Sequence, residues 1–334
     1  MITGKSTWTF SSYPVIVSSG VVVGKEEAVS NLNGHYDEAI EDMFVGEDSY
    51  ERAQESLLTK AIDYTIKKSS IKKKDIQFFI SGDLINQITP TTFAAKKLNI
   101  PYFGLYSACA TSTEGLALAA MMLEQNGANY ILTGTASHYA AAERQFRFPN
   151  EYGGQIPPTA QRTVTGAGTV LLGKEKQGLA ITSATIGKVM DYEVTDPFNM
   201  GAAMAPAAVD TICQHFQDRQ IDASYYDMIV TGDLGAVGRA LTEDLLKKHH
   251  ITFQSNQFID CGDFLYKKEQ NMQAGGSGAA CSSVVTYGYF LEQMKANKIN
   301  KLLFVATGAL HSPLTVQQKR TIPSIAHAVS IERK

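Results

Sequence analysis

Residues 106–120 read YSACATSTEGLALAA, and this stretch decides the fold class. Cys109 lies among small residues, after a short apolar run and before a segment that is almost wholly apolar. The pattern predicts a turn from a strand into a buried helix, with the thiol at the mouth of a pocket. Because a helix N-terminus favours a thiolate, we expect a lowered pKa for Cys109 and treat it as a candidate nucleophile. The alternative is a buried structural cysteine.

The composition is that of an ordinary globular protein with an ample core. Of the 334 residues, 44% are hydrophobic and 19% charged, and the formal net charge is -3. This balance predicts no nucleic-acid partner. The four cysteines lack CxxC spacing, which argues against a disulfide framework or a zinc cluster. We find no signal-peptide pattern and no apolar stretch near the ~20 residues that span a bilayer, so we expect a soluble protein.

Matching segments indicate an internal duplication. The members of each pair precede or form a turn, and the pairs follow the same order along the chain. They are 75–84 (DIQFFISGDL) with 227–234 (DMIVTGDL), Cys109 with the glycine-rich stretch 275–280, and 129–138 (NYILTGTASH) with 301–311 (KLLFVATGALH). We therefore expect two similar halves, residues 1–174 and 175–334.

Hydrophobic periodicity predicts alternating helices and strands. The expected helices are 50–68, 94–98, 115–125, 207–217, 236–248 and 282–295, and the clearest strands are 102–105, 165–173, 228–230 and 302–306. This alternation predicts an α/β protein with largely parallel central strands.

The chain resembles the thiolase superfamily, and within it the type III ketoacyl synthases and the stage V sporulation protein AD (SpoVAD) family of spore-forming bacteria. The specific strings are 80–87 (ISGDLINQ), 157–168 (PPTAQRTVTGAG) and 275–281 (GGSGAAC). The resemblance implies a thiolase-like fold, with two duplicated halves in a five-layer α-β-α-β-α arrangement. It also implies a homodimer, because proteins of this fold commonly pair central strands across a dimer.

The resemblance argues against enzymatic activity, because the expected catalytic groups are missing. Type III ketoacyl synthases use a histidine in a Val-His-Gln-Ala-Asn motif and an asparagine in a Gly-Asn-Thr-Ser motif. Here Thr231 and Gly276 stand at those positions in our alignment. The stretch 306–311 also lacks the second cysteine of degradative thiolases. The alternatives are an acyltransferase or ketoacyl-synthase-like enzyme that uses Cys109 with His138 or His311 as the base, and a scaffold with a vestigial pocket.

The SpoVAD resemblance implies a protein that binds dipicolinic acid (pyridine-2,6-dicarboxylate), or its calcium chelate, and supports its uptake into the developing spore. The implied partners are other stage V sporulation A proteins at the spore membrane, with this chain on the cytoplasmic side or peripheral to that membrane. We expect no cofactor. The expected ligand-binding residues are Asp83, Cys109, Ala110, Thr111, His138, Asp233, Gly276 and Ser277.

Two further sets of residues have competing interpretations. Asp83 and Asp233 end matching strands, so they could bind calcium through the ligand, or they could simply cap the following helices. Arg144 and Arg147 could bind an anion or belong to an intersubunit loop.

Overall fold

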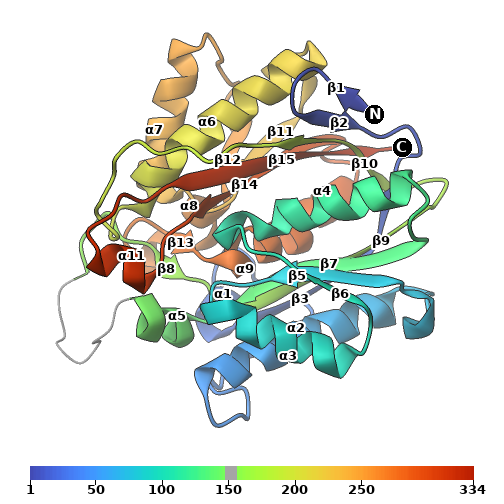
Figure 1. Ribbon diagram of the computed structural model, residues 1–334, viewed down its shortest axis with the longest axis horizontal. Coiled ribbons are helices and arrows are strands. Elements are labelled where there is room, and N and C mark those ends of the chain that lie inside the picture. Colours follow the sequence, from blue (N-terminus) through green and yellow to red (C-terminus); the bar gives the residue numbers. More distant parts are fainter. Residues whose placement is uncertain (147–155) are drawn as a thin grey trace.

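The structure is a computed structural model that describes residues 1–146 and 156–334. It has two layers of strands (Figure 1). The lower layer in that view contains β3 (Val15–Gly24), β5 (Phe78–Gly82), β6 (Tyr102–Gly104), β7 (Tyr130–Ser137) and β9 (Gly166–Gly173). The upper layer contains β10 (Leu179–Ile186), β11 (Met228–Thr231), β12 (Phe258–Asp260), β14 (Lys301–Ala309) and β15 (Ser324–Arg333).

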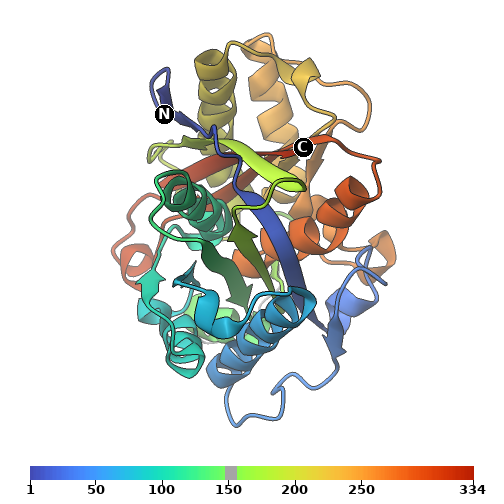
Figure 2. The same ribbon diagram turned by 90° about the vertical axis from the view of Figure 1, so that its right-hand side faces the viewer.

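Helices separate the two layers and cover both outer faces, which makes five layers (Figures 1 and 2). Helices α2 (Tyr50–Lys68) and α3 (Thr89–Leu98) lie below, and α6 (Met200–Arg219) and α7 (Gly235–Lys248) lie above. Helices α4 (Thr111–Glu124) and α9 (Ala279–Val284) lie between the sheets. The five-layer α-β-α-β-α prediction is confirmed.

Shorter elements complete the described chain. They are β1 (Ile2–Thr3), β2 (Thr7–Thr9), α1 (Lys25–Ala28), β4 (Glu38–Ile40), α5 (Tyr139–Phe146), β8 (Arg162–Thr163), α8 (Cys261–Leu265), β13 (Gly276–Ser277), a π-helical segment (Val285–Phe290), α10 (Leu291–Lys295) and α11 (Pro313–Gln317).

The same strand order occurs twice. From the edge inward, one layer runs β6-β5-β7-β9-β3 and the other β12-β11-β14-β15-β10, and β3 pairs with β10 where the two meet. The three outer strands of each layer are parallel, but β9 and β15 are antiparallel to their neighbours. The sheets are therefore mixed rather than largely parallel. The chain division at residues 174 and 175 stays a prediction.

Helix α4 is apolar on nearly all sides because it packs between the two sheets. Leu116, Ala119 and Leu123 are completely buried in it. At Gly115 the helix lies so close to β7 that a Cβ atom would collide with the Thr133 hydroxyl. This packing fixes the position of the α4 N-terminus, and with it the turn that carries Cys109.

Most expected elements are present, with shifted bounds. The predicted helix 50–68 is α2, but α3 and α6 begin earlier than expected, at Thr89 and Met200. The segment expected as one helix, 282–295, instead comprises α9, the π-helical segment and α10.

Candidate functional site

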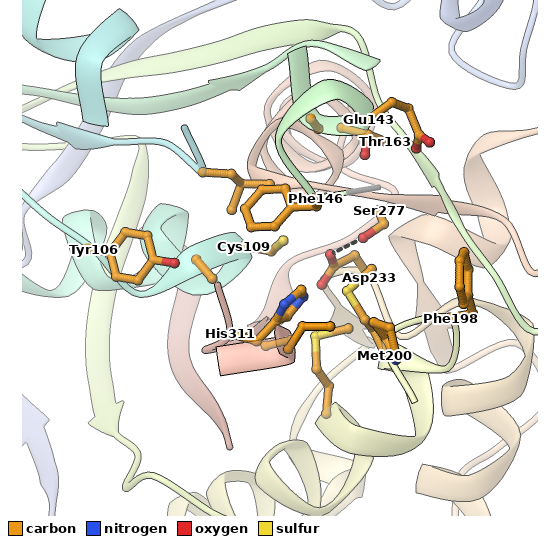
Figure 3. A pocket seen from close by; sticks show the side chains of 17 residues that line it. Tyr106, Cys109, Glu143, Phe146, Thr163, Phe198, Met200, Asp233, Ser277 and His311 are labelled. Carbon is orange, nitrogen blue, oxygen red and sulfur yellow. Dashed lines mark hydrogen bonds between the residues drawn. The ribbon is translucent and has the colours of Figure 1, made fainter. Parts of the chain in front are cut away.

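A cavity of about 260 Å³ lies where the two halves meet, at the N-terminal end of α4 (Figure 3). Its walls come from the Cys109 turn, from α5, from the ends of β11 and β14, and from the segment that leads into α6. The lining residues are Leu84, Tyr106, Ala108, Cys109, Ala142, Glu143, Phe146, Thr163, Pro197, Phe198, Met200, Met204, Asp233, Ser277, Ala309, His311 and Val316.

The Cys109 turn has the predicted geometry. Ala108 has a φ of 48°, and residues 108–110 form a single 3-10 turn that leads into α4. The Thr111 hydroxyl donates to the Ala108 carbonyl (2.7 Å), which stabilises this turn. At Gly308 a Cβ atom would collide with the Ser107 carbonyl, so β14 packs directly against the turn. The thiol consequently faces the cavity, as expected.

The expected lowering of the Cys109 pKa is wrong. Burial raises this pKa well above the ordinary thiol value, and the adjacent Asp233 carboxylate raises it further. The Gly278 N–H and the Ser277 hydroxyl act in the opposite direction, but their effects are smaller. Desolvation and a neighbouring negative charge therefore outweigh the favourable helix N-terminus. Cys109 is a neutral thiol near neutral pH.

Asp233 follows β11 and is completely buried at the wall of the cavity. Its Oδ2 accepts hydrogen bonds from the Ser277 hydroxyl (3.0 Å) and the Gly278 N–H (3.1 Å), and its Oδ1 accepts one from the Thr307 hydroxyl (3.0 Å). Burial raises the pKa of Asp233 to about 6, although the hydrogen bond from Cys109 and the other donors counteract this rise. Asp233 is thus ionised for the most part at neutral pH and orients the thiol.

The expectation that Asp83 faces the same cavity is wrong. Asp83 is completely buried, and it is absent from the lining of the cavity. Its Oδ1 accepts from the Ile85 N–H (2.7 Å), and its Oδ2 accepts from the N–H (2.9 Å) and hydroxyl (2.5 Å) of Thr91. Asp83 therefore binds the first turn of α3, which resembles the helix-capping alternative, although the N-cap residue of that helix is Ile88.

The two candidate histidines are in different places. His138 is buried away from the cavity, where its Nε2 lies 2.8 Å from the Met43 carbonyl and its ring stacks on Tyr50. Burial lowers its pKa. His311 does line the cavity, and its ring packs against Phe146 with the centroids 5.4 Å apart. Of the two expected bases, only His311 can meet a ligand beside Cys109.

Of the remaining expected residues, some line the cavity and others do not. Ser277 lines the cavity, whereas Ala110, Thr111 and Gly276 do not. Ala110 packs against β14 at Gly308, and Gly276 lies in β13, which pairs with β8. All three residues are buried outside the lining of this cavity, and their role in ligand binding stays a prediction.

Thr231, which stands where the catalytic histidine was expected, lies outside the cavity. The Thr231 hydroxyl donates to Asp260 (2.8 Å). Asp233, two residues later, is the group beside the thiol. In place of a donor for a developing oxyanion, the site has a carboxylate, which would repel that negative charge.

Several lining residues were not expected from the sequence. Glu143 and Phe146 extend from α5, Phe198 comes from the segment that leads into α6, and Met200 and Met204 belong to α6 itself. No sequence pattern identified the first pair. Nearby, Arg144 forms an ion pair with Glu51 (2.5 Å), and Arg147 lies outside the described residues.

In the described part of the chain, no cluster of three or more histidine, cysteine, aspartate or glutamate side chains could hold a metal ion. Calcium ligation by Asp83 and Asp233 together is therefore wrong, since only Asp233 reaches the cavity. A metal ion at this site would have to be bound largely by the ligand.

The five layers and the cysteine at the start of the central helix define a thiolase-like fold of the ketoacyl-synthase type. The 3-oxoacyl-[acyl-carrier-protein] synthase III of Aquifex aeolicus VF5 has a similar structure (TM-score 0.61, 11% identity), and the match covers 96% of this chain and 99% of that chain. A variant of OleA from Xanthomonas campestris is also similar (TM-score 0.62, 12% identity), with 97% and 100% covered. These likenesses are of fold alone.

The sequence comparisons are more specific. The family model of Stage V sporulation protein AD (SpoVAD) matches residues 4–332. Stage V sporulation protein AD of Bacillus subtilis (strain 168) is 44% identical over 333 residues, which are 99% of this chain and 98% of that relative. The chain belongs to the SpoVAD family, and the expected resemblance is confirmed.

Proposed function

We propose that this protein is a non-enzymatic ligand-binding protein of sporulation, which binds dipicolinic acid or its calcium chelate and supports its uptake into the developing spore. One observation carries the proposal. The family's cavity is present, but its cysteine is hydrogen-bonded to a buried carboxylate and has a raised pKa. The cavity is thus suited to hold a small molecule and poorly suited to react with one.

The lining of the cavity supports an aromatic ligand. Phe146 and Phe198 offer ring faces and edges, and Met200 and Met204 offer thioethers, which make favourable contacts with aromatic rings. The hydroxyl of Thr163, which also lines the cavity, could orient a carboxylate. A planar ring with two carboxylates matches this combination.

The charge of the cavity favours the calcium chelate over the free dianion. Asp233 contributes negative charge, and no lysine or arginine occurs among the described lining residues. A free dianion would be repelled by this carboxylate. A chelate of one calcium ion and one dipicolinate has no net charge, and its calcium could accept additional oxygen ligands.

The lack of turnover is part of the proposal. A thiol with a raised pKa is a weak nucleophile, and the adjacent Asp233 disfavours an oxyanion. The second candidate function is an acyltransferase that uses Cys109, and the position of His311 in the same cavity favours it. Release of CoA from acetyl-CoA would distinguish the two.

We propose the remaining partners on the basis of the family. They are other stage V sporulation A proteins and a second copy of this chain. Two observations agree with a homodimer: β6 ends the described sheet, and Phe103 on it is exposed. No helix among the described residues is long and apolar enough to cross a bilayer.

The proposal is tested by isothermal titration calorimetry with dipicolinate, with and without calcium. The wild-type protein should bind the chelate at one site per chain, with a dissociation constant below ~1 mM. Cys109→Trp should abolish binding because the indole would fill much of the cavity. Asp83→Asn is the matched control, because Asp83 lies outside the cavity. Absence of binding by the wild type at millimolar chelate would leave the scaffold as the better interpretation.

A further inference from the structure

A second, larger hollow adjoins the cavity. This outer groove has a volume of about 760 Å³ and is lined by residues 84–88, 104–106, 145–146 and 311–314. Four residues line both spaces, namely Leu84, Tyr106, Phe146 and His311. Among the described residues, the side chains of this shared wall separate the cavity from the outer groove.

The shared wall is thin. Tyr106 is 51% exposed. Its pKa is raised first by its own partial burial and second by the nearby Cys109, so the phenol lies close to the thiol. One side chain thus extends from solvent to the immediate surroundings of Cys109. Figure 3 shows Tyr106 on one side of the cavity and Phe198 on the other.

Phe146 and His311 meet in the shared wall. Their rings lie edge to face, with an interplanar angle of 62°, and neither residue is fully buried. Phe146 is the last residue of α5, and His311 lies between β14 and α11, so the two rings belong to separate elements. Rotation of the Phe146 side chain would open this part of the wall without displacing a helix or strand.

The neighbouring backbone is held in place. Gln145 donates to the Leu84 carbonyl (2.9 Å) and accepts from the Asn86 N–H (2.7 Å), which ties α5 to the floor of the outer groove. Gln87 and Ile88 have φ values of 56° and 48°, and such a conformation is unfavourable for a β-branched residue. The floor is therefore fixed, and Phe146 is the adjustable part of the wall.

We infer that the outer groove is the entrance to the cavity, and that Phe146 is a side-chain gate between them. No lysine, arginine, aspartate or glutamate is among the described residues that line the groove, so it suits a small uncharged complex such as the metal chelate of a planar dicarboxylate. The identity of this ligand rests on the proposed function. The gate itself concerns access to Cys109 and can be measured without any ligand.

The test is the rate at which methyl methanethiosulfonate modifies Cys109, followed by peptide mass mapping in a Cys213→Ser background. Removing the half-buried Cys213 eliminates the other accessible thiol. Phe146→Ala should speed modification about tenfold, which corresponds to ~1.4 kcal/mol. Phe146→Trp should slow it. Phe198→Ala, on the opposite side of the cavity, is the matched control and should change the rate less than about twofold.

The completely buried Cys261 and Cys281 provide an internal control for unfolding, because they become modified only if the core opens. An unchanged rate in Phe146→Ala, or a larger acceleration in Phe198→Ala, would overturn the inference. Protection of wild-type Cys109 by calcium dipicolinate tests the proposed function separately. If protection is absent but the Phe146 variants behave as expected, the gate stands and the ligand is wrong.

Discussion

Replacing Asp233 by asparagine would substitute a neutral amide of the same shape for a completely buried carboxylate. The existing hydrogen bonds accommodate this change well. The asparagine oxygen can accept from the Gly278 N–H and the Ser277 hydroxyl, and its amide can donate to Thr307, whose hydroxyl can reorient. The change therefore removes a charge without leaving a backbone donor unpaired.

The size of the expected change in stability follows from the pKa of Asp233. Burial raises the pKa of Asp233 from 3.8 to about 6 in the folded protein. The sign is that of a raised pKa: the contribution of Asp233 to stability is fully present below about pH 3.8 and is lost as the pH rises through about 6. The total loss is about 3 kcal/mol, of which about 2 kcal/mol falls between pH 4.5 and 7.5.

The assay is urea denaturation of the wild type and Asp233→Asn across that pH range. The free energy of unfolding of the variant relative to the wild type should rise by about 2 kcal/mol between pH 4.5 and 7.5. The variant should also bind calcium-free dipicolinate about tenfold more tightly at neutral pH, because one repelling charge is gone. Parallel stability profiles would refute the reasoning, since they would mean that Asp233 is not ionised in a buried position.

Three further predictions follow from the same site. Asp83→Asn should lower the free energy of unfolding by about 1–3 kcal/mol in urea denaturation. Each Asp83 oxygen accepts from a backbone N–H, and the NH₂ group of asparagine would leave one of these two donors without an acceptor. An unchanged free energy of unfolding would contradict the role of Asp83 at the start of α3. In assays of malonyl-thioester decarboxylation and CoA release, the wild type should stay far below ordinary enzyme rates of ~1–10³ s⁻¹, and turnover within that range would favour the acyltransferase. Alkylation of Cys109 by iodoacetamide near pH 7.5 should be faster in Asp233→Asn than in the wild type, because the variant lacks the charge that raises the thiol pKa; equal rates would count against that cause.

The parts of the fold that local sequence determines could be predicted. The apolar run after Cys109 predicted a buried helix, and α4 lies between the two sheets. The duplicated strand ends predicted the repeated strand order that the structure contains. These features could be predicted because small residues, hydrophobic periodicity and turn residues act over a few positions.

The site could be predicted only in part, because its properties depend on contacts between distant segments. Asp83 and Asp233 have the same local sequence, but the first faces the start of α3 and the second faces the glycine turn beside Ser277. The pKa of Cys109 depends on Asp233, which belongs to the other end of the duplication. Glu143 and Phe146 reach the cavity because α5 packs across its mouth, and no local pattern indicated that placement.

The central claim is that this cavity holds calcium dipicolinate and does not react with it. A crystal structure of the wild-type protein grown with calcium dipicolinate tests this most directly. We predict one ligand per chain in the cavity, its ring between Phe146 and Phe198, one carboxylate near Thr163 and an unmodified Cys109. An empty cavity at millimolar chelate, a ligand bound elsewhere on the surface, or a covalent adduct on Cys109 would contradict the claim.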